Sequence, residues 1–196
     1  MVADKPRRWS LILAGRLASR TSITRGPCYD VELYSMHKRE LVVAKIRRAA
    51  ITDQQEIFDL VPRLVEFGPP AWRDAAAMSV TDRKVIGAAL LSSTDDPIVL
   101  VAVSTDHVMM GFVHLHSVVD YYTERRNGHV ADIVVAEAYE GRGIGRQLLA
   151  VGEDWARAQR YDWLTISVFH ENVRAARTYE QLGFKPDFGR LLKPLR

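Results

Sequence analysis

The chain has 196 residues, of which 47% are hydrophobic, and its formal net charge at pH 7 is +3. A chain of this length and composition is expected to form one globular domain with a sizeable core. The single cysteine, Cys28, excludes an internal disulfide and any cysteine-based metal cluster, and it fits a reducing cytoplasm. No apolar run approaches the roughly 18 residues of a membrane-spanning helix, so we expect a cytoplasmic protein without a membrane partner.

The positive charge is concentrated near the N-terminus. Residues 1–45 contain nine Lys/Arg and four Asp/Glu, whereas residues 46–196 contain 18 Lys/Arg and 20 Asp/Glu. We therefore expect 1–40 to be a basic extension, either flexible or the product of a start codon placed upstream of the true one, with a targeting peptide or a functional arm as alternatives. The domain itself is expected over 41–196. Because that part carries no excess of positive charge, nucleic acid is not expected to be its partner.

The first half of the domain predicts one strand followed by two helices. Apolar residues at 41–46 predict the strand. Thr52 and Gln55 form a capping-box pair that predicts a helix start, and Pro62 is expected to kink or end that helix. A second helix is predicted over 74–91, after a Gly-Pro-Pro break.

The second half alternates between strands and helices. A hairpin turn is predicted at Asn127 and Gly128, and Gly183 is expected to end the last helix. The predicted elements are, in chain order, strands over 98–104, 108–118 and 129–135, a helix over 144–160, a strand over 162–169, a helix over 172–182 and a final strand over 188–195. This order predicts an α+β class, or α/β sandwich, in which a mixed, mainly antiparallel sheet is flanked by helices on both faces.

Between a predicted strand and a predicted helix, 139–149 has the sequence Y-E-G-R-G-I-G-R-Q-L-L. The first N–H groups of a helix have no intrahelical partner, and the helix dipole places partial positive charge there. Glycines let the backbone approach a phosphate closely, and the stretch has three glycines and two arginines: Gly141, Gly143, Gly145, Arg142 and Arg146. The glycine spacing matches neither G-x-G-x-x-G nor the Walker pattern. The turn therefore predicts a site for a diphosphate-bearing ligand, with a simple tight connection as the alternative.

A second informative stretch, 170–184, has the sequence H-E-N-V-R-A-A-R-T-Y-E-Q-L-G-F. Together the two stretches resemble the GNAT superfamily of acetyl-CoA-dependent N-acetyltransferases. In the first family motif, Val135 marks the start and Gly143-Ile144-Gly145 marks the end. In the second motif, the matching positions are Asn172, Ala175, Tyr179, Gly183 and Phe184. The resemblance extends from Lys45 to the C-terminus.

The resemblance implies the GNAT fold, acetyl-CoA as co-substrate, and transfer of its acetyl group to an amine of a small molecule or peptide by direct attack in a ternary complex. Because the family often dimerises, a homodimer is also implied. One position departs from the family pattern: Glu140 stands where the family usually has Arg or Gln. This carboxylate either weakens acyl-CoA binding or points to solvent. A catalytically inactive acyl-CoA-binding or regulatory domain is therefore the alternative function.

The resemblance also assigns the cofactor site to the two motifs. The backbone N–H of Val135 would meet the acyl carbonyl, and the Tyr179 hydroxyl would protonate the leaving thiolate. Otherwise Tyr179 would only pack its ring on the sheet, and Asn172 would either bind the pantetheine arm or cap its helix. The implied cofactor-binding residues are Val134, Val135, Glu140, Gly141, Arg142, Gly143, Ile144, Gly145, Arg146, Asn172, Ala175 and Tyr179.

The group that removes the proton from the amine stays open between three options. The family often carries an acidic residue where this chain has Asp132. His114 and His116 project to one face of a predicted strand, and an imidazole with an ordinary pKa of about 6.5 can take a proton directly. The third option is a reaction without a dedicated side-chain base. The H-x-H pattern also suits a metal, but there is no third clear ligand, so no metal is expected.

The amine pocket is assigned to the connection before the predicted hairpin turn and to the first helical region. Asp120, Tyr121 and Tyr122 would line it, with Asp120 attracting a cationic acceptor, and Phe67 would close another wall. A plain polar loop with two aromatic anchors is the alternative. The slight negative charge of 46–196 favours a cationic small molecule as the acceptor.

Overall fold

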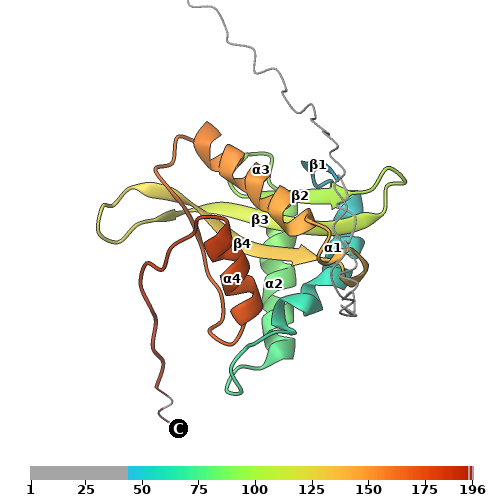
Figure 1. Cartoon of the computed structure of the whole chain (residues 1–196). Helices are drawn as coiled ribbons and strands as arrows, with labels where there is room; N and C mark the ends of the chain where they lie inside the picture. The colour runs from blue at the N-terminus through green and yellow to red at the C-terminus, as the bar shows by residue number, and fades with distance from the viewer. Residues whose placement is uncertain (1–43, 194, 196) are drawn as a thin grey trace, which may run out of the picture. The chain divides into compact units, whose positions relative to one another are not determined.

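The computed structural model describes residues 44–193 and 195, and the expected basic extension, 1–40, lies outside them. Figure 1 shows the helices and strands of the described part. Their order is β1 (Lys45–Arg48), η1 (Ile51–Asp53), α1 (Gln54–Leu60), η2 (Val61–Val65), α2 (Ala75–Leu90), β2 (Ile98–Val103), β3 (Met109–Val119), β4 (Arg126–Val135), η3 (Glu137–Tyr139), α3 (Ile144–Ala158), β5 (Leu164–Ile166) and α4 (Val173–Gln181).

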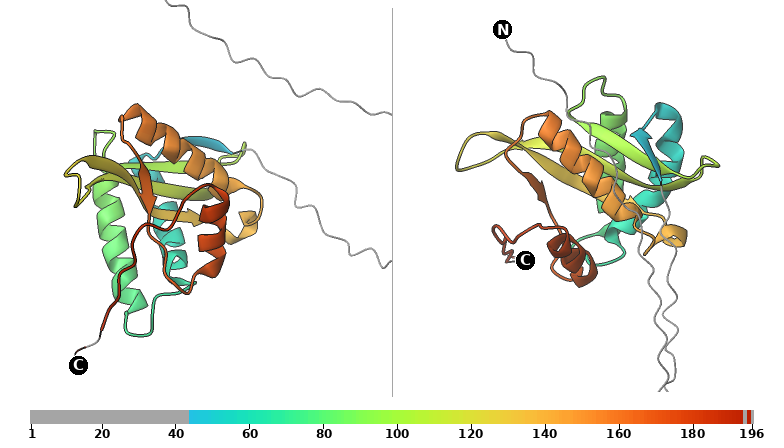
Figure 2. Two further views of the ribbon diagram at one scale, coloured as in Figure 1. Left: turned by 60° about the vertical axis from the view of Figure 1, so that its left-hand side comes forward. Right: turned by 45° about the horizontal axis from the view of Figure 1, so that its top comes forward.

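The described strands form one sheet in the order β1-β2-β3-β4-β5. Neighbouring strands run antiparallel, except for β4 and β5, which are parallel. Figures 1 and 2 show α3 on one face of the sheet and α1 and α2 on the other. The expected mixed, mainly antiparallel sheet with helices on both faces is therefore confirmed.

Strand β2, which lies between β1 and β3, explains why the core has two halves. All six of its residues are buried, and successive side chains point to opposite faces. Its even-numbered side chains belong to the apolar cluster that includes α3, and its odd-numbered side chains belong to the cluster that includes α1 and α2. A strand buried on both faces accounts for the unbroken apolar run over 98–103.

The predicted turn at Asn127 and Gly128 is wrong. Both residues lie inside β4, and the chain reverses over 120–125, where the Asp120 carboxylate accepts hydrogen bonds from two backbone N–H groups of the turn. Little room is left for a side chain at Gly128, since an added Cβ would lie 2.9 Å from Leu164 Cδ1, 3.1 Å from Trp155 Cζ3 and 3.3 Å from Ala156 Cβ. The Asn-Gly pair therefore marks a close contact within a strand, and not a change of direction.

Two other predicted strands differ from the structure. The strand predicted over 162–169 is limited to the three residues of β5, because only those residues pair with β4. The final strand predicted over 188–195 does not form in the described residues of that range, where the chain pairs with no other strand. Pro62 ends the regular helix α1 as expected, and the chain continues there as the 3-10 helix η2.

The start of the first helical region is held by Asp53 and not by the predicted pair of Thr52 and Gln55. Asp53 Oδ2 accepts a hydrogen bond from the Ala50 N–H at 2.7 Å. The guanidinium of Arg47 donates to both Asp53 oxygens, at 2.6 and 2.8 Å. These hydrogen bonds, that from Arg47 first, lower the pKa of the Asp53 carboxyl. The cap therefore depends on a charged network that reaches back to β1.

We expect Asp53→Ala to lower the free energy of unfolding by about 2 kcal/mol, because it removes charged hydrogen bonds from a buried position. Since the pKa of Asp53 is lowered in the folded state, its contribution is complete above its ordinary pKa of 3.8 and is lost as pH falls through the lowered value. Urea unfolding measures the loss. Asp59→Ala, at an exposed position of α1, is the matched control. Equal losses in the two variants would contradict the assignment.

Candidate active site

Strands β4 and β5 separate where the candidate site forms. They pair only from Gly128 to Val130 of β4, so β5 does not cover the edge of the remaining part of β4. The register between β3 and β4 shifts after His114, which leaves Ala131 as an extra residue in β4. The separation of the two parallel strands therefore coincides with a bulge in β4.

The backbone of Val135 faces this uncovered edge. The Ala136 N–H donates to Met110 O at 2.9 Å, which makes these two residues a hydrogen-bonded pair of the antiparallel ladder. Because hydrogen-bonded pairs alternate with non-bonded pairs, the adjacent pair of Gly111 and Val135 is non-bonded. The Val135 N–H and C=O therefore point away from β3, toward the side on which β5 has separated.

The glycine turn connects this end of β4 to α3. Gly143 is the N-cap of α3 with φ 85°, and Gly141 has φ 70°, so both use the left-handed backbone that glycine favours. The Gln147 N–H bonds to Gly143 O, and the N–H groups before it have no acceptor within the helix. An added Cβ at Gly145 would meet one described side chain, Val135 Cγ2, at an ordinary 3.6 Å. The turn therefore presents backbone donors and the positive helix end beside Val135.

The carboxylate of Glu140 lies between two guanidinium groups. Arg63 Nη2 donates to one carboxylate oxygen at 2.6 Å, and Arg174 Nη1 donates to the other at 2.7 Å. Arg63 also donates from Nε to Val135 O at 3.2 Å, and its side chain is only 15% exposed. Glu140 therefore does not point freely to solvent, and its charge is balanced. The network joins η2, the glycine turn and α4.

A close backbone contact joins the loop after η2 to the start of α4. Gly68 has φ 124°, and an added Cβ would lie 3.1 Å from Glu171 Cβ. Phe67, which was expected to line the acceptor pocket, precedes this contact and is half-exposed. Asn172 is the N-cap of α4, and its Oδ1 accepts a hydrogen bond from the Ala175 N–H at 3.1 Å. Of the two roles expected for Asn172, the structure shows the cap.

Tyr179 combines a packed ring with a protonated hydroxyl. Its ring lies against the apolar cluster that includes α3 and meets Phe184 edge to face, with ring centroids 6.0 Å apart. Burial raises the pKa of the Tyr179 hydroxyl above its ordinary value of 10.0, so the group keeps its proton at neutral pH. The expected packing of the ring is thus present, and it leaves a proton donor on α4.

A row of polar side chains lies on the face of β3 and β4 that α1 and α2 cover. His114 is buried, and its Nδ1 donates to Asp132 Oδ2 at 2.9 Å. The ring centroids of His114 and His116 are 5.7 Å apart, and those of His116 and His129 are 5.4 Å apart. The structure therefore brings together the three predicted candidate bases and adds His129 to them.

Each of these histidines donates a hydrogen bond from Nδ1. The neutral form of each ring is therefore the tautomer with its hydrogen at Nδ1. His116 Nδ1 donates to Ser117 O at 3.0 Å, and His129 Nδ1 donates to Thr165 Oγ1 at 2.8 Å. Thr165 gives its own hydroxyl hydrogen to Gly128 O, so it can only accept from His129. Burial, followed by the charge of His116, lowers the pKa of His129. Each neutral ring in the row therefore carries its lone pair at Nε2.

The remaining residues assigned to the cofactor site surround the turn. The Arg142 guanidinium lies 5.7 Å from the centroid of the Tyr139 ring, and Arg146 donates to Gln181 Oε1 of α4 at 3.0 Å. Two of the predicted residues bury their side chains in the apolar clusters, so only their backbone groups are available to a ligand: Val134 and Ile144.

The structure does not bring Asp120, Tyr121 and Tyr122 to this site within one chain. They lie at the tip of the β3–β4 hairpin, which Figure 1 shows projecting away from the turn between β4 and α3. Tyr121 and Tyr122 are highly exposed, and their rings contact each other edge to face. The Asp120 carboxylate is used within its own turn, where hydrogen bonds from Thr123 lower its pKa.

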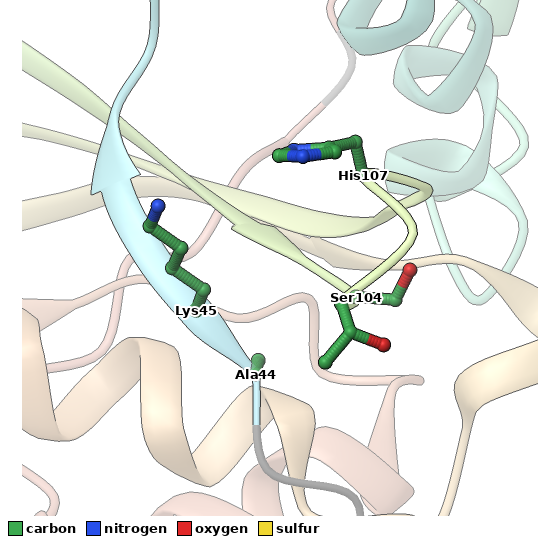
Figure 3. Close-up of a pocket in the computed structure, with 5 residues that line it drawn as sticks. Ala44, Lys45, Ser104 and His107 are labelled. Atoms are coloured by element: carbon green, nitrogen blue, oxygen red, sulfur yellow. The ribbon is translucent and has the colours of Figure 1, made fainter.

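A separate depression of about 570 Å³ lies beside β1 and the β2–β3 connection, and Figure 3 shows its lining: Ala44, Lys45, Ser104, Thr105 and His107. It includes none of the predicted site residues.

Among residues 44–193 and 195, no group of three or more His, Cys, Asp or Glu side chains is placed to hold a metal ion. None of the helices described above combines the length and hydrophobicity needed to cross a membrane.

This sheet with its separated parallel strands and glycine turn has the fold of N-acetyltransferases of known structure. The structure of AAC(6')-Iy with the bisubstrate analogue CoA-S-monomethyl-acetylneamine matches 79% of this chain and 99% of its own chain, with a TM-score of 0.59 and 20% identity. At this level of identity the likeness concerns the fold alone.

The sequence comparisons identify the family. The family model described as Acetyltransferase (GNAT) family matches residues 62–184, so the chain belongs to this family and the resemblance is confirmed. Aminoalkylphosphonate N-acetyltransferase of Salmonella typhimurium is 26% identical over 164 residues, which cover 82% of this chain and 98% of that protein. Streptothricin acetyltransferase of Streptomyces lavendulae is 33% identical over 84 residues, which cover 43% of this chain and 42% of that protein. The chain spans less than half the length of the first curated relatives that it matches.

Proposed function

We propose that this protein is an acetyl-CoA-dependent N-acetyltransferase that passes the acetyl group directly to an amine in a ternary complex. The observation that carries the proposal is the uncovered edge of β4, where the Val135 N–H points outward beside the N-terminus of α3. Membership of the family and the named N-acetyltransferase relatives support the same activity.

The glycine turn suits the diphosphate of coenzyme A. Backbone N–H groups at a helix start, together with the helix dipole, stabilise bound anions. Gly141 and Gly143 allow the close approach that this needs, and Arg174, with a side chain that is 65% exposed, adds positive charge at the turn. With the diphosphate held there, the pantetheine arm would follow the uncovered edge of β4, and the thioester carbonyl would meet the Val135 N–H. That donor would stabilise the negative charge that develops on the carbonyl oxygen.

The Asp132–His114 pair is the proposed acceptor of the proton from the amine. An ammonium ion has no lone pair, so the amine must lose a proton before or during its attack on the thioester. Asp132 lies on the same strand as Val135, three residues earlier, and His114 holds one of its carboxylate oxygens. His116 is the next ring along the row and would pass the proton onward.

The proposed reaction needs one base, which takes the proton of the amine, and one acid, which gives a proton to the leaving sulfur. The amine nitrogen bonds to the acetyl carbon, the carbon–sulfur bond breaks, and the Tyr179 hydroxyl supplies a proton to the sulfur. The phenol suits this role because burial keeps it protonated at neutral pH. The alternative of an inactive acyl-CoA-binding domain depended on Glu140, and the pairing of Glu140 with Arg63 and Arg174 supports the active enzyme over this alternative.

The activity is tested by measuring thiol release from acetyl-CoA in the presence of monoamines, diamines, amino sugars, amino acids and peptides. We expect release that requires an added amine and that matches the acetylated amine in amount, as quantified by mass spectrometry. A control without protein measures spontaneous transfer. Binding of acetyl-CoA without thiol release from any amine of this panel would favour the regulatory alternative.

A further inference from the structure

We propose that the acceptor carries a second amino group, and that Asp82 of α2 binds this group as an ammonium ion while the first amine reacts beside Asp132. The acceptors would then be small molecules with two or more amines. This inference rests on the proposed function, because it concerns the acceptor side of the same site. Asp82 belongs to neither of the motifs that identify the family.

Asp82 lies on the side of α2 that faces the sheet. Ser79, Ile86 and Ala89 are the buried residues of this helix, and their spacing places Asp82 on the same face. Ile86 and Ala89 pack into the apolar cluster with β2 and β3, but the cluster includes no residue of α2 before Ile86. The first half of α2 is therefore outside the apolar cluster, and Asp82 is the carboxylate on its sheet-facing side.

Asp82 on α2 is close enough to Asp132 on β4 to feel its negative charge. Burial, and then the negative charge of Asp132, raise the pKa of Asp82 to about 6. Within the described part of the chain, no Lys or Arg forms an ion pair with either carboxylate, and Asp132 has His114 as its partner. Two carboxylates that act on each other through their charges repel, and a bound cation would relieve that repulsion.

Asn127 supplies a second and independent sign of a ligand. Its side chain is 1% exposed, and neither its amide oxygen nor its amide nitrogen has a hydrogen-bond partner. Asn127 precedes His129 by two residues on β4, so it lies on the face that carries the polar row. Buried amides are nearly always hydrogen-bonded. A polar molecule that extends along the row would supply hydrogen-bond partners for the Asn127 amide.

The other polar groups of the row are acceptors of hydrogen bonds. The carboxylates of Asp82 and Asp132 only accept, and each ring of His114, His116 and His129 donates from Nδ1, so that its Nε2 is an acceptor whenever the ring is neutral. An ammonium group offers N–H donors together with positive charge. The row therefore complements amines, and it would repel an acceptor with a carboxylate or phosphate at this position.

The reaction keeps the roles of the two amines separate. The amine beside Asp132 loses its proton to that pair and bonds to the acetyl carbon, while the sulfur leaves with the proton from Tyr179. The second amine keeps its proton throughout and contributes only binding at Asp82. Removal of the Asp82 charge should therefore weaken the selection between acceptors.

The test compares 1,4-diaminobutane with butylamine, which has the same chain length and lacks the second amine. The full-length protein is expected to use the diamine with a kcat/KM at least about 10-fold higher. Asp82→Asn is expected to bring this ratio close to one, and Asp82→Glu, which keeps the charge, is expected to retain most of it. Asp154→Asn removes an exposed carboxylate of α3 and is the control that should keep the wild-type ratio.

The outcomes separate this inference from the proposed function. Asp82→Asn is expected to melt no lower than the wild type, because it removes a charge that burial disfavours. Equal use of the two amines by the wild type, or an unchanged preference in Asp82→Asn, would overturn the inference and leave the acetyltransferase intact. Absence of thiol release with every amine, although acetyl-CoA binds, would overturn the proposed function.

Discussion

Replacement of Tyr179 by Phe is expected to lower kcat by about 100-fold and to change the dissociation constant of acetyl-CoA by less than about 3-fold. Phe keeps the ring that packs beside α3 and against Phe184, so the fold and the cofactor site should persist. It removes only the hydroxyl, which burial keeps protonated and which the mechanism uses to protonate the departing sulfur. Steady-state thiol release and calorimetric binding of acetyl-CoA measure the two quantities separately.

Tyr161→Phe is the matched control for this experiment. Tyr161 follows α3, and its hydroxyl donates to Asp96 Oδ2 at 3.2 Å, away from the glycine turn. Its loss should leave kcat close to the wild-type value. An unchanged kcat in Tyr179→Phe would remove the acid role, and equal decreases in both variants would show that the effect is structural.

The second large effect is expected from Arg63→Ala, which should weaken acetyl-CoA binding by about 10- to 100-fold. Arg63 is the less exposed of the two arginines that hold Glu140, and it also bonds to the backbone oxygen of Val135. Without it, the partly buried carboxylate of Glu140 next to the glycine turn would lose one of its ion pairs. A negative charge there opposes the diphosphate, and the end of β4 loses a contact that orients it.

A double variant separates these two causes. If charge balance is the main role of Arg63, Arg63→Ala/Glu140→Ala should bind acetyl-CoA more tightly than Arg63→Ala alone, since it removes the unbalanced carboxylate. Arg157→Ala on α3 removes an exposed arginine that also pairs with two carboxylates, and it serves as the control. If the double variant binds no better than the single one, the charge-balance account is contradicted.

The sequence predicted most of the fold because its local signals were strong. The helix periodicity before Gly183, the buried run of β2 and the glycine turn each identified an element without knowledge of its neighbours. His114 and His116 were correctly expected on one face of a strand, since side chains of a strand alternate between its two faces. The family motifs then indicated Tyr179 and Val135, whose catalytic roles stay predictions.

The sequence could not predict contacts between distant parts of the chain. Arg63 and Glu140 are 77 residues apart, and nothing near Arg63 indicates that it pairs with the turn. Asp82 has the local appearance of an ordinary helix carboxylate, and Asp132, whose charge acts on it, lies on another element. Gly128 was interpreted as a turn residue because Asn-Gly often forms hairpins, whereas in the structure it lies within β4 and the side chains of Trp155, Ala156 and Leu164 pack closely over it. Tertiary packing decides each of these cases.

The central claim is that the backbone donors of the glycine turn hold a diphosphate beside the uncovered edge of β4. Calorimetric titration with three compounds tests it most directly: coenzyme A, dephospho-coenzyme A, which keeps the diphosphate, and pantetheine, which lacks it. The first two are expected to bind, with pantetheine at least about 100-fold weaker. Equal affinities for pantetheine and coenzyme A, or no detectable binding of coenzyme A, would contradict the claim.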